Sequence, residues 1–446
     1  MDTPICDFVT QYSAADPLRM HMPGHKGFPY LGSEHLDITE IQGADNLFDP
    51  QSIIRKSEEN AGSLFGCHTL YSTEGSSLCI RAMLYLCMLY AKSKGCKPMV
   101  AAPRNVHSAF VSAAALLDFD IQWLYPEQAD SYLSYTVTPR QLEHWLSSVP
   151  QLPVAVYLTT PDYLGVMSDI QQIAQVCHKF GVLLAVDNAH GAYLKFLPQS
   201  LHPIDLGADL CCDSAHKTLP VLTGGAYLHI SRQAPKLLLA QGKQAMALFA
   251  STSPSYLILQ SLDRANAYLA DEFPRQLADF LPQLARTKSD LEHLGYAFLG
   301  YEPMKLTFGC KAYGYTGNDM ACYLQSLGIY VEFCDPDYLV LMPTPEIGAS
   351  GLKRLKSALT SLPKLALIPD PPPLPGIGEQ VLTPREAALS PFEAVPASQC
   401  LGRILARSSV GCPPAVPIVI CGERIDEAAL SCFSYYGIEY CNVILP

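Results

Sequence analysis

Short apolar runs separated by longer helix-compatible segments, repeated over residues 61–265, constrain the fold of this chain most strongly. This spacing is typical of βαβ units. Most of the runs are continuous rather than alternating, which favours parallel strands covered on both faces. We therefore predict an α/β domain with a mainly parallel sheet. Its expected strands are Met99–Ala102, Ile121–Tyr125, Val154–Leu158, Leu183–Val186, Leu210–Cys212 and Ala226–Ile230.

The sequence outside this large domain predicts four further parts. Residues 1–60 are punctuated by Pro and Gly and predict an extended N-terminal arm. Residues 266–367 predict a smaller α/β domain, and the Pro-rich residues 368–377 predict a stiff linker. Residues 378–446 predict a small C-terminal module. The elements expected in the smaller domain are strands near Lys305–Phe308 and Leu339–Met342 and a helix near Asp319–Leu327.

Charge and composition exclude several classes of function. The net charge of −12, from 42 acidic and 30 basic residues, disfavours binding to nucleic acid or anionic lipid and favours cationic small molecules. No apolar run reaches about 18 residues, and the chain does not start with a basic region followed by an apolar one. We expect no membrane span and no signal peptide. The 16 cysteines lack C-x-x-C pairs and zinc-ligand spacing, which predicts reduced thiols, a cytoplasmic location and no metal site.

Polar residues follow the predicted strands at their carboxyl ends, where open parallel sheets bind ligands. His107 and Thr160 come shortly after two of these strands, and Asp187 and Lys217 after two others. Each residue alone fits an ordinary structural role, such as a solvated lysine, a loop histidine or a helix cap. Their shared position and order favour one site over four separate structural roles.

These residue types suit pyridoxal phosphate (PLP), which needs a lysine amine, a carboxylate facing the pyridine nitrogen and a flat side chain stacked on the ring. Lys217, Asp187 and His107 supply these groups in turn. The turn formed by Gly75, Ser76 and Ser77 opens a helical pattern, and its free N–H groups and hydroxyls suit the phosphate.

The segment from Ser214 to Ala226, which begins Ser-Ala-His-Lys, closely resembles the PLP-lysine motif of the bacterial ornithine/lysine/arginine decarboxylase family. The resemblance implies an aspartate-aminotransferase-like (fold type I) large domain, a small domain and a C-terminal module. It also implies a homodimer or higher homo-oligomer with the active site at the subunit interface. Similar motifs occur in the same order at residues 21–27, 37–40, 104–107, 187–192 and 252–256, and more weakly at 328–332 and 422–425.

By this resemblance Lys217 would carry the cofactor, Asp187 would face its pyridine nitrogen and His107 would stack on its ring. His190 would lie beside the cofactor, and Thr160 is a candidate for contact with its phenolic oxygen. The resemblance also implies a set of residues around the phosphate: Ser76, Ser77, Ser214 and His216, with Ser253 and Ser255 from the neighbouring subunit.

The chain departs from the family pattern at four positions that bear on the substrate pocket. It has Asn188 where the family has an acidic residue and Tyr193 where the family often has His. It has Asp162 in place of Thr and Phe48 in place of His. These departures leave the cofactor-binding set intact.

The resulting hypothesis is PLP-dependent decarboxylation of a cationic amino acid, with arginine to agmatine preferred and lysine and ornithine as alternatives. An acidic side chain should meet the distal cation of the substrate, and Glu332, Asp45 and Asp162 are the candidates. Another PLP reaction on the same fold, such as transamination or aldol-type cleavage, is an alternative, as is a PLP-binding protein with little activity. The Ser-Ala-His-Lys217 motif argues against a cofactor-free binding protein.

Overall fold

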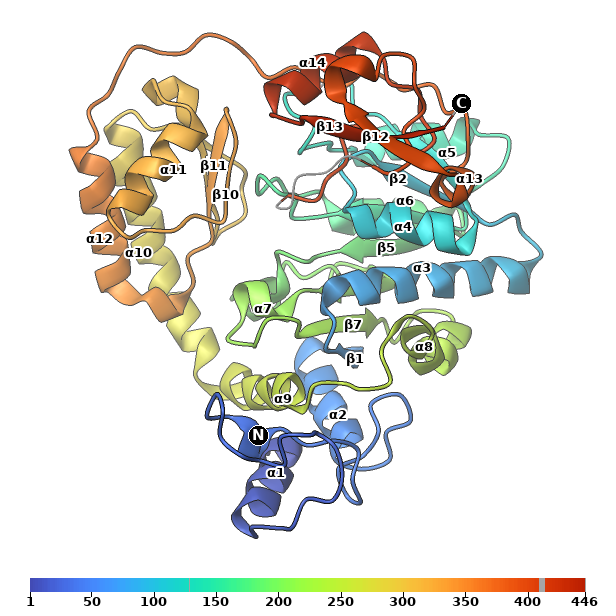
Figure 1. Ribbon diagram of the computed structural model, residues 1–446, viewed down its shortest axis with the longest axis vertical. Helices are drawn as coiled ribbons and strands as arrows, with labels where there is room; N and C mark the ends of the chain where they lie inside the picture. Colours follow the sequence, from blue (N-terminus) through green and yellow to red (C-terminus); the bar gives the residue numbers. More distant parts are fainter. Residues whose placement is uncertain (128, 409–413, 446) are drawn as a thin grey trace. The chain divides into compact units, whose positions relative to one another are not determined.

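The computed structural model describes residues 1–127, 129–408 and 414–445. The chain divides into two compact units, each built from segments that lie apart in the sequence (Figure 1). The first unit contains residues 1–97, 150–157 and 170–276, and the second contains residues 98–149, 158–169 and 277–446.

The first unit holds one part of the central sheet. Its strands are β1 (His68–Ser72), β4 (Ala155–Thr159, of which the first three residues lie in this unit), β5 (Leu183–Asp187), β6 (Leu210–Asp213) and β7 (Ala226–Ile230). They follow one another in the order β1, β7, β6, β5, β4. β5 and β6 run parallel, whereas β7 runs antiparallel to both β6 and β1. Every residue of β5, β6 and β7 is buried, as expected for strands built from continuous apolar runs.

Helix α3 (Gly75–Lys94) is the main helix packed on this part of the sheet, where it contacts β6 and β7. It also packs against α8 (Lys236–Phe249) (Figure 1). The other helices of the first unit are α1 (Pro4–Ala14), η1 (Glu34–Leu36), α2 (Ile53–Phe65), α6 (Ile170–Lys179), η2 (Ala192–Phe196), α7 (Ala215–Thr218) and α9 (Tyr256–Asp271).

The second unit begins with β2 (Met99–Pro103) and β3 (Asp120–Leu124), which form a parallel pair. Helix α4 (Ser108–Leu117) connects these two strands. Helix α5 (Pro139–Ser148) follows and starts with a capping box, in which the side chain of Thr138 and that of Gln141 each bond to the other's backbone.

A four-stranded antiparallel sheet forms the next part of the second unit, in the order β10, β11, β9, β8. Its strands are β8 (Phe298–Leu299), β9 (Leu306–Gly309), β10 (Phe333–Cys334) and β11 (Tyr338–Leu341). The accompanying helices are α10 (Phe273–His293, of which residues 277–293 lie in this unit), η3 (Cys310–Tyr313), α11 (Gly317–Ser326), η4 (Pro345–Ile347) and α12 (Gly348–Ser361).

Residues 363–379, all of them described, contain neither helix nor strand. The elements after them are α13 (Pro384–Leu389), β12 (Phe392–Pro396), η5 (Ala397–Gln399), α14 (Glu427–Tyr435) and β13 (Tyr440–Ile444). Their apolar side chains share one core with earlier parts of the same unit, because Phe433 and Ile425 are buried together with Leu133, Leu164 and Phe333.

The structure confirms the predicted mixed α/β class with a mainly parallel central sheet. All eight predicted strands are present within one residue of the predicted bounds. The sequence failed to predict β1, because its residues His-Thr-Leu-Tyr-Ser contain no continuous apolar run. It also gave no sign that β1 and β7 run antiparallel. Among the described residues, none of the helices is both long and apolar enough to cross a membrane.

Candidate active site

In the first unit, the segments that follow two neighbouring parallel strands, β5 and β6, carry predicted site residues at the same edge of the sheet. β5 ends at Asp187, and in the parallel strand β6 the residue opposite Asp187 is Cys212. The chain after β5 leads to His190, and the chain after β6 leads to Lys217. There Lys217 Nζ lies 2.9 Å from His190 Nε2. The predicted lysine and one of its predicted histidine neighbours are therefore in direct contact.

The carboxylate of Asp187 is buried, with 1% of the residue exposed. It accepts hydrogen bonds from the Tyr157 hydroxyl at 3.2 Å and from the Ala189 backbone N–H at 3.2 Å. The Cys212 thiol approaches it at 3.6 Å. All three donors are neutral, so they orient the carboxylate without cancelling a negative charge on it.

The start of α3 supplies hydroxyl and N–H groups close to the lysine segment. The Ser214 hydroxyl donates to Ser76 Oγ at 2.7 Å, and Ser76 and Ser77 both lie in the first turn of α3. The first N–H groups of a helix have no partner within it and attract anions. This end of α3 can therefore hold a phosphate.

Two glycines allow this close packing. Gly75 has a φ of +73° and donates its N–H to the Gly224 carbonyl at 2.7 Å. A Cβ on Gly224 would stand 2.8 Å from the Thr73 carbonyl oxygen, closer than real Cβ atoms come. The turn before α3 and the turn after Lys217 therefore depend on a residue without a side chain.

His216 is tied to the backbone. Its Nδ1 lies 2.9 Å from the Gly225 carbonyl oxygen, which also accepts the His216 backbone N–H at 3.2 Å. The Lys217 N–H donates to the Ser214 carbonyl at 3.0 Å. These bonds fix the short helix α7 that carries the lysine.

The second unit holds His107 and Thr160. His107 is half-buried and caps α4, since its Nδ1 accepts the Ala109 N–H at 3.1 Å. This bond makes Nδ1 an acceptor, so that in a neutral ring Nε2 carries the proton. Thr160 is buried, and its hydroxyl oxygen accepts the Ser168 N–H at 3.0 Å.

A buried ion pair holds the strand end just before His107. The Arg104 guanidinium bonds to both carboxylate oxygens of Glu423, with 5% and 1% of these residues exposed. It also lies over the Trp123 ring. The Ser108 N–H donates to the Ala415 carbonyl at 2.8 Å. The C-terminal residues of this unit therefore fix the backbone on both sides of His107, a contact the sequence gave no means to predict.

The two serines predicted to reach a neighbouring subunit lie before α9 in the first unit. Ser255 caps α9 by accepting the Ile258 N–H. Ser253 is exposed, and its backbone N–H donates to Ser251 Oγ at 3.1 Å. An exposed serine at this point is available to a second chain.

The sequence analysis missed a buried polar network behind Asp187. The Asp213 carboxylate contacts His202 Nε2 at 3.0 Å and His229 Nε2 at 3.1 Å, and all three side chains are fully buried. It also accepts the Asn188 side-chain amide at 2.7 Å. His229 interrupts an apolar run, which is the one sequence signal of a partner inside the protein.

Charge pairing decides the ionisation of this network. Burial alone would raise the pKa of Asp213, but the imidazoles of His202 and His229 hold it well below its usual range. Burial alone would lower the pKa of His229, but Cys67 and Asp213 raise it above its ordinary value. His202, Cys211 and Asp213 also carry potential metal-ligand atoms within 4.8 Å of one another. Hydrogen bonds within the protein already engage their imidazole and carboxylate groups.

The four departures from the family pattern are all in ordered surroundings. Asn188 belongs to the Asp213 network, and Tyr193 is fully buried. Asp162 accepts the Ser134 hydroxyl and the Leu164 and Val166 N–H groups, and burial raises its pKa to about 6. Phe48 is half-buried and donates its N–H to the Asn46 side chain.

The three candidates for the distal cation differ in their contacts. The Asp45 carboxylate accepts backbone N–H groups from four residues at 3.0 Å or less, which commits it to the loop before α2. Asp162 is similarly engaged by its own loop. Glu332 is half-buried and accepts the Tyr163 hydroxyl at 3.2 Å. Glu332 therefore retains the most capacity to accept further hydrogen bonds.

Comparison with known proteins gives consistent matches. The sequence pattern of the Orn/Lys/Arg decarboxylase major domain matches residues 3–297. Arginine decarboxylase of Bacillus subtilis is 29% identical over 96% of this chain and 92% of its own length. Arginine decarboxylase of Halalkalibacterium halodurans is 30% identical over the same shares of the two chains.

Solved structures show the same fold. The lysine decarboxylase of Francisella novicida covers 99% of this chain with a TM-score of 0.79 and 17% identity, over 81% of its own chain. An alanine–glyoxylate aminotransferase from Nostoc covers 70% of this chain with a TM-score of 0.55 and 15% identity, over 88% of its own chain.

Proposed function

The chain belongs to the Orn/Lys/Arg decarboxylase family, and on that premise we propose that it binds PLP on Lys217 and converts arginine to agmatine. The protein is an amino-acid decarboxylase, and a basic amino acid is its substrate. Its fold is the aspartate-aminotransferase-like (fold type I) class that the sequence predicts. Arginine is preferred because similar chains matched along nearly their whole length are arginine decarboxylases. Lysine and ornithine are the alternatives.

The contact between Lys217 and His190 beside the buried Asp187 carries the cofactor proposal. The donor set fits PLP: an amine, a buried carboxylate that accepts from neutral donors in the described residues, and paired serine hydroxyls at a helix start. When bound, PLP supplies a conjugated ring that accepts the electron pair left at Cα as the carboxyl group departs.

Asp187 keeps the pyridine nitrogen protonated, because a buried carboxylate next to that nitrogen favours its charged form. Tyr157 and the Ala189 N–H fix the orientation of this carboxylate. Ser76, Ser77 and Ser214 bind the phosphate together with the first N–H groups of α3.

The pair Lys217 and His190 handles protons. At 2.9 Å one of the two nitrogens carries the hydrogen between them, so His190 can take a proton from Lys217 or return it. Lys217 Nζ, or His107 if it stacks on the ring, delivers the proton to Cα after the carboxyl group has left. A pocket without a strong cation for the carboxylate favours its loss, since that charge disappears in the transition state.

Glu332 binds the distal cation of the substrate. We expect Glu332→Gln to raise the KM for arginine about tenfold or more, because a charge-assisted hydrogen bond becomes a neutral one. Asp45→Asn serves as the contrasting variant, since it weakens a loop that its carboxylate organises. It should lower thermal stability more than it changes KM. Equal KM values for Glu332→Gln and the wild type would assign the cation to another residue.

The test of the whole proposal is CO₂ release from arginine, lysine and ornithine by the purified protein and by Lys217→Ala. We expect bound cofactor to give the native protein a visible absorbance band, release of CO₂ from arginine above the other two substrates, and loss of both signals in the variant. A visible band without CO₂ from any of the three would contradict the substrate class and keep the cofactor site.

We further propose that the protein is a homodimer or higher homo-oligomer and that it is located in the cytoplasm. Ser253 and several large apolar side chains between residues 18 and 31 are exposed, and exposed apolar side chains favour contact with a second subunit. The fifteen described cysteines are free thiols, which is consistent with a reducing compartment. The product agmatine would enter polyamine-type metabolism.

A further inference from the structure

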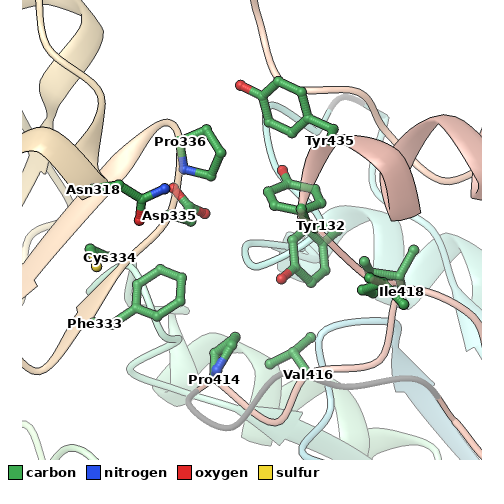
Figure 2. A pocket seen from close by; sticks show the side chains of 13 residues that line it. Tyr132, Asn318, Phe333, Cys334, Asp335, Pro336, Pro414, Val416, Ile418 and Tyr435 are labelled. Atoms are coloured by element: carbon green, nitrogen blue, oxygen red, sulfur yellow. The ribbon is translucent and has the colours of Figure 1, made fainter. Parts of the chain in front are cut away.

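A cavity of about 290 Å³ lies wholly within the second unit. Its wall includes Tyr132, Phe333, Tyr435 and Tyr436, so much of the lining is aromatic. Phe333 lies on one side of the space and Tyr132 and Tyr435 lie on the other (Figure 2). The volume suits a small organic molecule.

Three tyrosine rings meet at steep angles on this wall. The Tyr132 and Tyr436 rings have centroids 4.9 Å apart with planes inclined by 60°, and those of Tyr435 and Tyr436 are 5.0 Å apart at 86°. Rings set at such angles form the adjoining sides of a cage. Aromatic cages of this kind attract cations through the negative faces of the rings.

A carboxylate lines the same cavity with one oxygen unpartnered. Asp335 is 7% exposed and lies on the wall opposite Tyr132 (Figure 2). Its Oδ1 accepts the backbone N–H groups of Asp337 and Tyr338, both at 2.7 Å. Its Oδ2 is buried and has no hydrogen-bond partner in the described part of the chain. A buried acceptor left in this state costs free energy until a donor fills it.

The ammonium group of Lys311 is already engaged. Lys311 Nζ lies 2.7 Å from Asp337 Oδ1, and the Tyr435 hydroxyl donates to the same oxygen at 2.9 Å. Lys311 and Asp337 therefore balance each other, which leaves the charge of Asp335 to be met by something else. The Tyr436 hydroxyl, also on the cavity wall, is a second buried group with no partner in the described residues.

We propose that this cavity binds a small organic cation with N–H groups, a primary alkylammonium or an alkylguanidinium. The cation donates to Asp335 Oδ2 and lies against the tyrosine faces, and its alkyl part contacts Phe333. The residues that line the cavity all belong to the second unit, whereas Lys217 and His190 belong to the first, and the inference goes beyond the proposed reaction.

The test is calorimetric titration of the full-length protein with n-butylammonium and with 1-pentanol, a neutral molecule of similar length. We expect the ammonium to bind about tenfold or more tightly than the alcohol. Asp335→Asn should weaken ammonium binding about tenfold or more, because asparagine keeps an acceptor for the two backbone N–H groups and loses the charge. Equal binding of the two probes, or no measurable binding of either, overturns the proposal.

Matched variants test whether the ammonium binds at Asp335 itself. Asp118→Asn removes the same charge from an exposed residue of the same unit at a left-handed position that asparagine tolerates, and it should bind like the wild type. Tyr435→Phe keeps a ring in the wall and should bind the ammonium, whereas Tyr435→Leu should bind it several-fold more weakly. If Asp335→Asn binds like Asp118→Asn, the proposal is wrong.

Lys217→Ala distinguishes this proposal from the proposed reaction. We expect the ammonium to bind Lys217→Ala as it binds the wild type, even though the variant has lost decarboxylation. Loss of ammonium binding in Lys217→Ala would place the cation at the lysine and would contradict a second site.

Discussion

Asp213 in the first unit and Asp335 in the second are both buried carboxylates, and their surroundings differ in one respect. Asp213 contacts two imidazoles and an amide, and its pKa is held well below the usual range although burial opposes this. Asp335 receives two backbone N–H groups and makes no ion pair with a described residue, and burial raises its pKa to about 7. Burial alone does not decide the charge of a carboxylate; its partners do.

The comparison also separates two kinds of site. In the first unit the Asp213 carboxylate has hydrogen-bond partners within the protein before any ligand arrives, as is typical of a preorganised polar site. In the second unit Asp335 Oδ2 has no hydrogen-bond partner among the described residues, which is typical of a site that needs its ligand.

The largest effect is expected for Asp187, the proposed catalytic carboxylate in the first unit. Asp187→Asn keeps the shape of the side chain and removes the charge that we propose holds the pyridine nitrogen of PLP protonated. We expect kcat for CO₂ release to fall by about 100-fold or more. The measurement is kcat at saturating cofactor and arginine. A fall below tenfold would mean that another group protonates the nitrogen.

Asp213→Asn tests whether the two imidazoles depend on their carboxylate. Removing one member of a buried ion pair costs about 3 kcal/mol, so we expect a loss of unfolding free energy of this size at pH 7. Since the folded pKa of Asp213 is lowered, its contribution is present above its ordinary value of 3.8 and is lost as the pH falls further. Chemical denaturation at pH 7 measures the loss, and a variant as stable as the wild type would refute the pairing.

Asp335→Asn should increase the unfolding free energy as the pH rises, whereas Asp213→Asn should decrease it. The folded pKa of Asp335 is raised from 3.8 to about 7, so its contribution is fully present below the ordinary value and is lost as the pH rises through 7. Around it Asp337 opposes ionisation and Lys311 favours it. Relative to the wild type, the variant should therefore gain about 2 kcal/mol of unfolding free energy between pH 5 and pH 8.

Denaturation of both proteins at the two pH values, without added amine, checks the Asp335 prediction. A constant difference in unfolding free energy would show that Asp335 keeps one charge state throughout. n-Butylammonium should reduce the gain at pH 8, because the cation stabilises the ionised wild type.

The smallest expected effect is that of Ser214→Ala, which removes one hydroxyl from the proposed phosphate site at the start of α3. We expect the dissociation constant of PLP to rise about fivefold, equivalent to about 1 kcal/mol for one hydrogen bond. Fluorescence titration of the cofactor-free protein measures it. Ser253→Ala tests the predicted contact from the neighbouring subunit: an equal rise would support this contact, and unchanged affinity would exclude it.

The positions of the candidate site residues in the first unit could largely be predicted, because these residues follow strands built from continuous apolar runs. The runs before Asp187 and Lys217 are apolar throughout, and parallel strands bring their carboxyl ends to one edge. The pairing of Lys217 with His190 follows from that edge. The roles of all these residues toward the cofactor stay predictions, those of Thr160 and His107 included.

The cavity around Asp335 in the second unit could not be predicted in the same way. Asp335 looks like any turn carboxylate in Cys-Asp-Pro-Asp, and Tyr132 and Tyr436 lie 304 positions apart in the sequence. The Asp213 network escaped prediction for a related reason: its histidines come from a loop and from the antiparallel strand β7, whose direction the sequence did not reveal.

By itself the sequence determined the fold class, the strand positions and the motif residues at the sheet edge, because these depend on local apolar patterning and on short contiguous motifs. Only the tertiary structure decided which buried charges have partners. The partners of Asp213, Arg104 and Asp335 come from distant segments, and whether each carboxylate is paired depends on distances that only the folded chain defines.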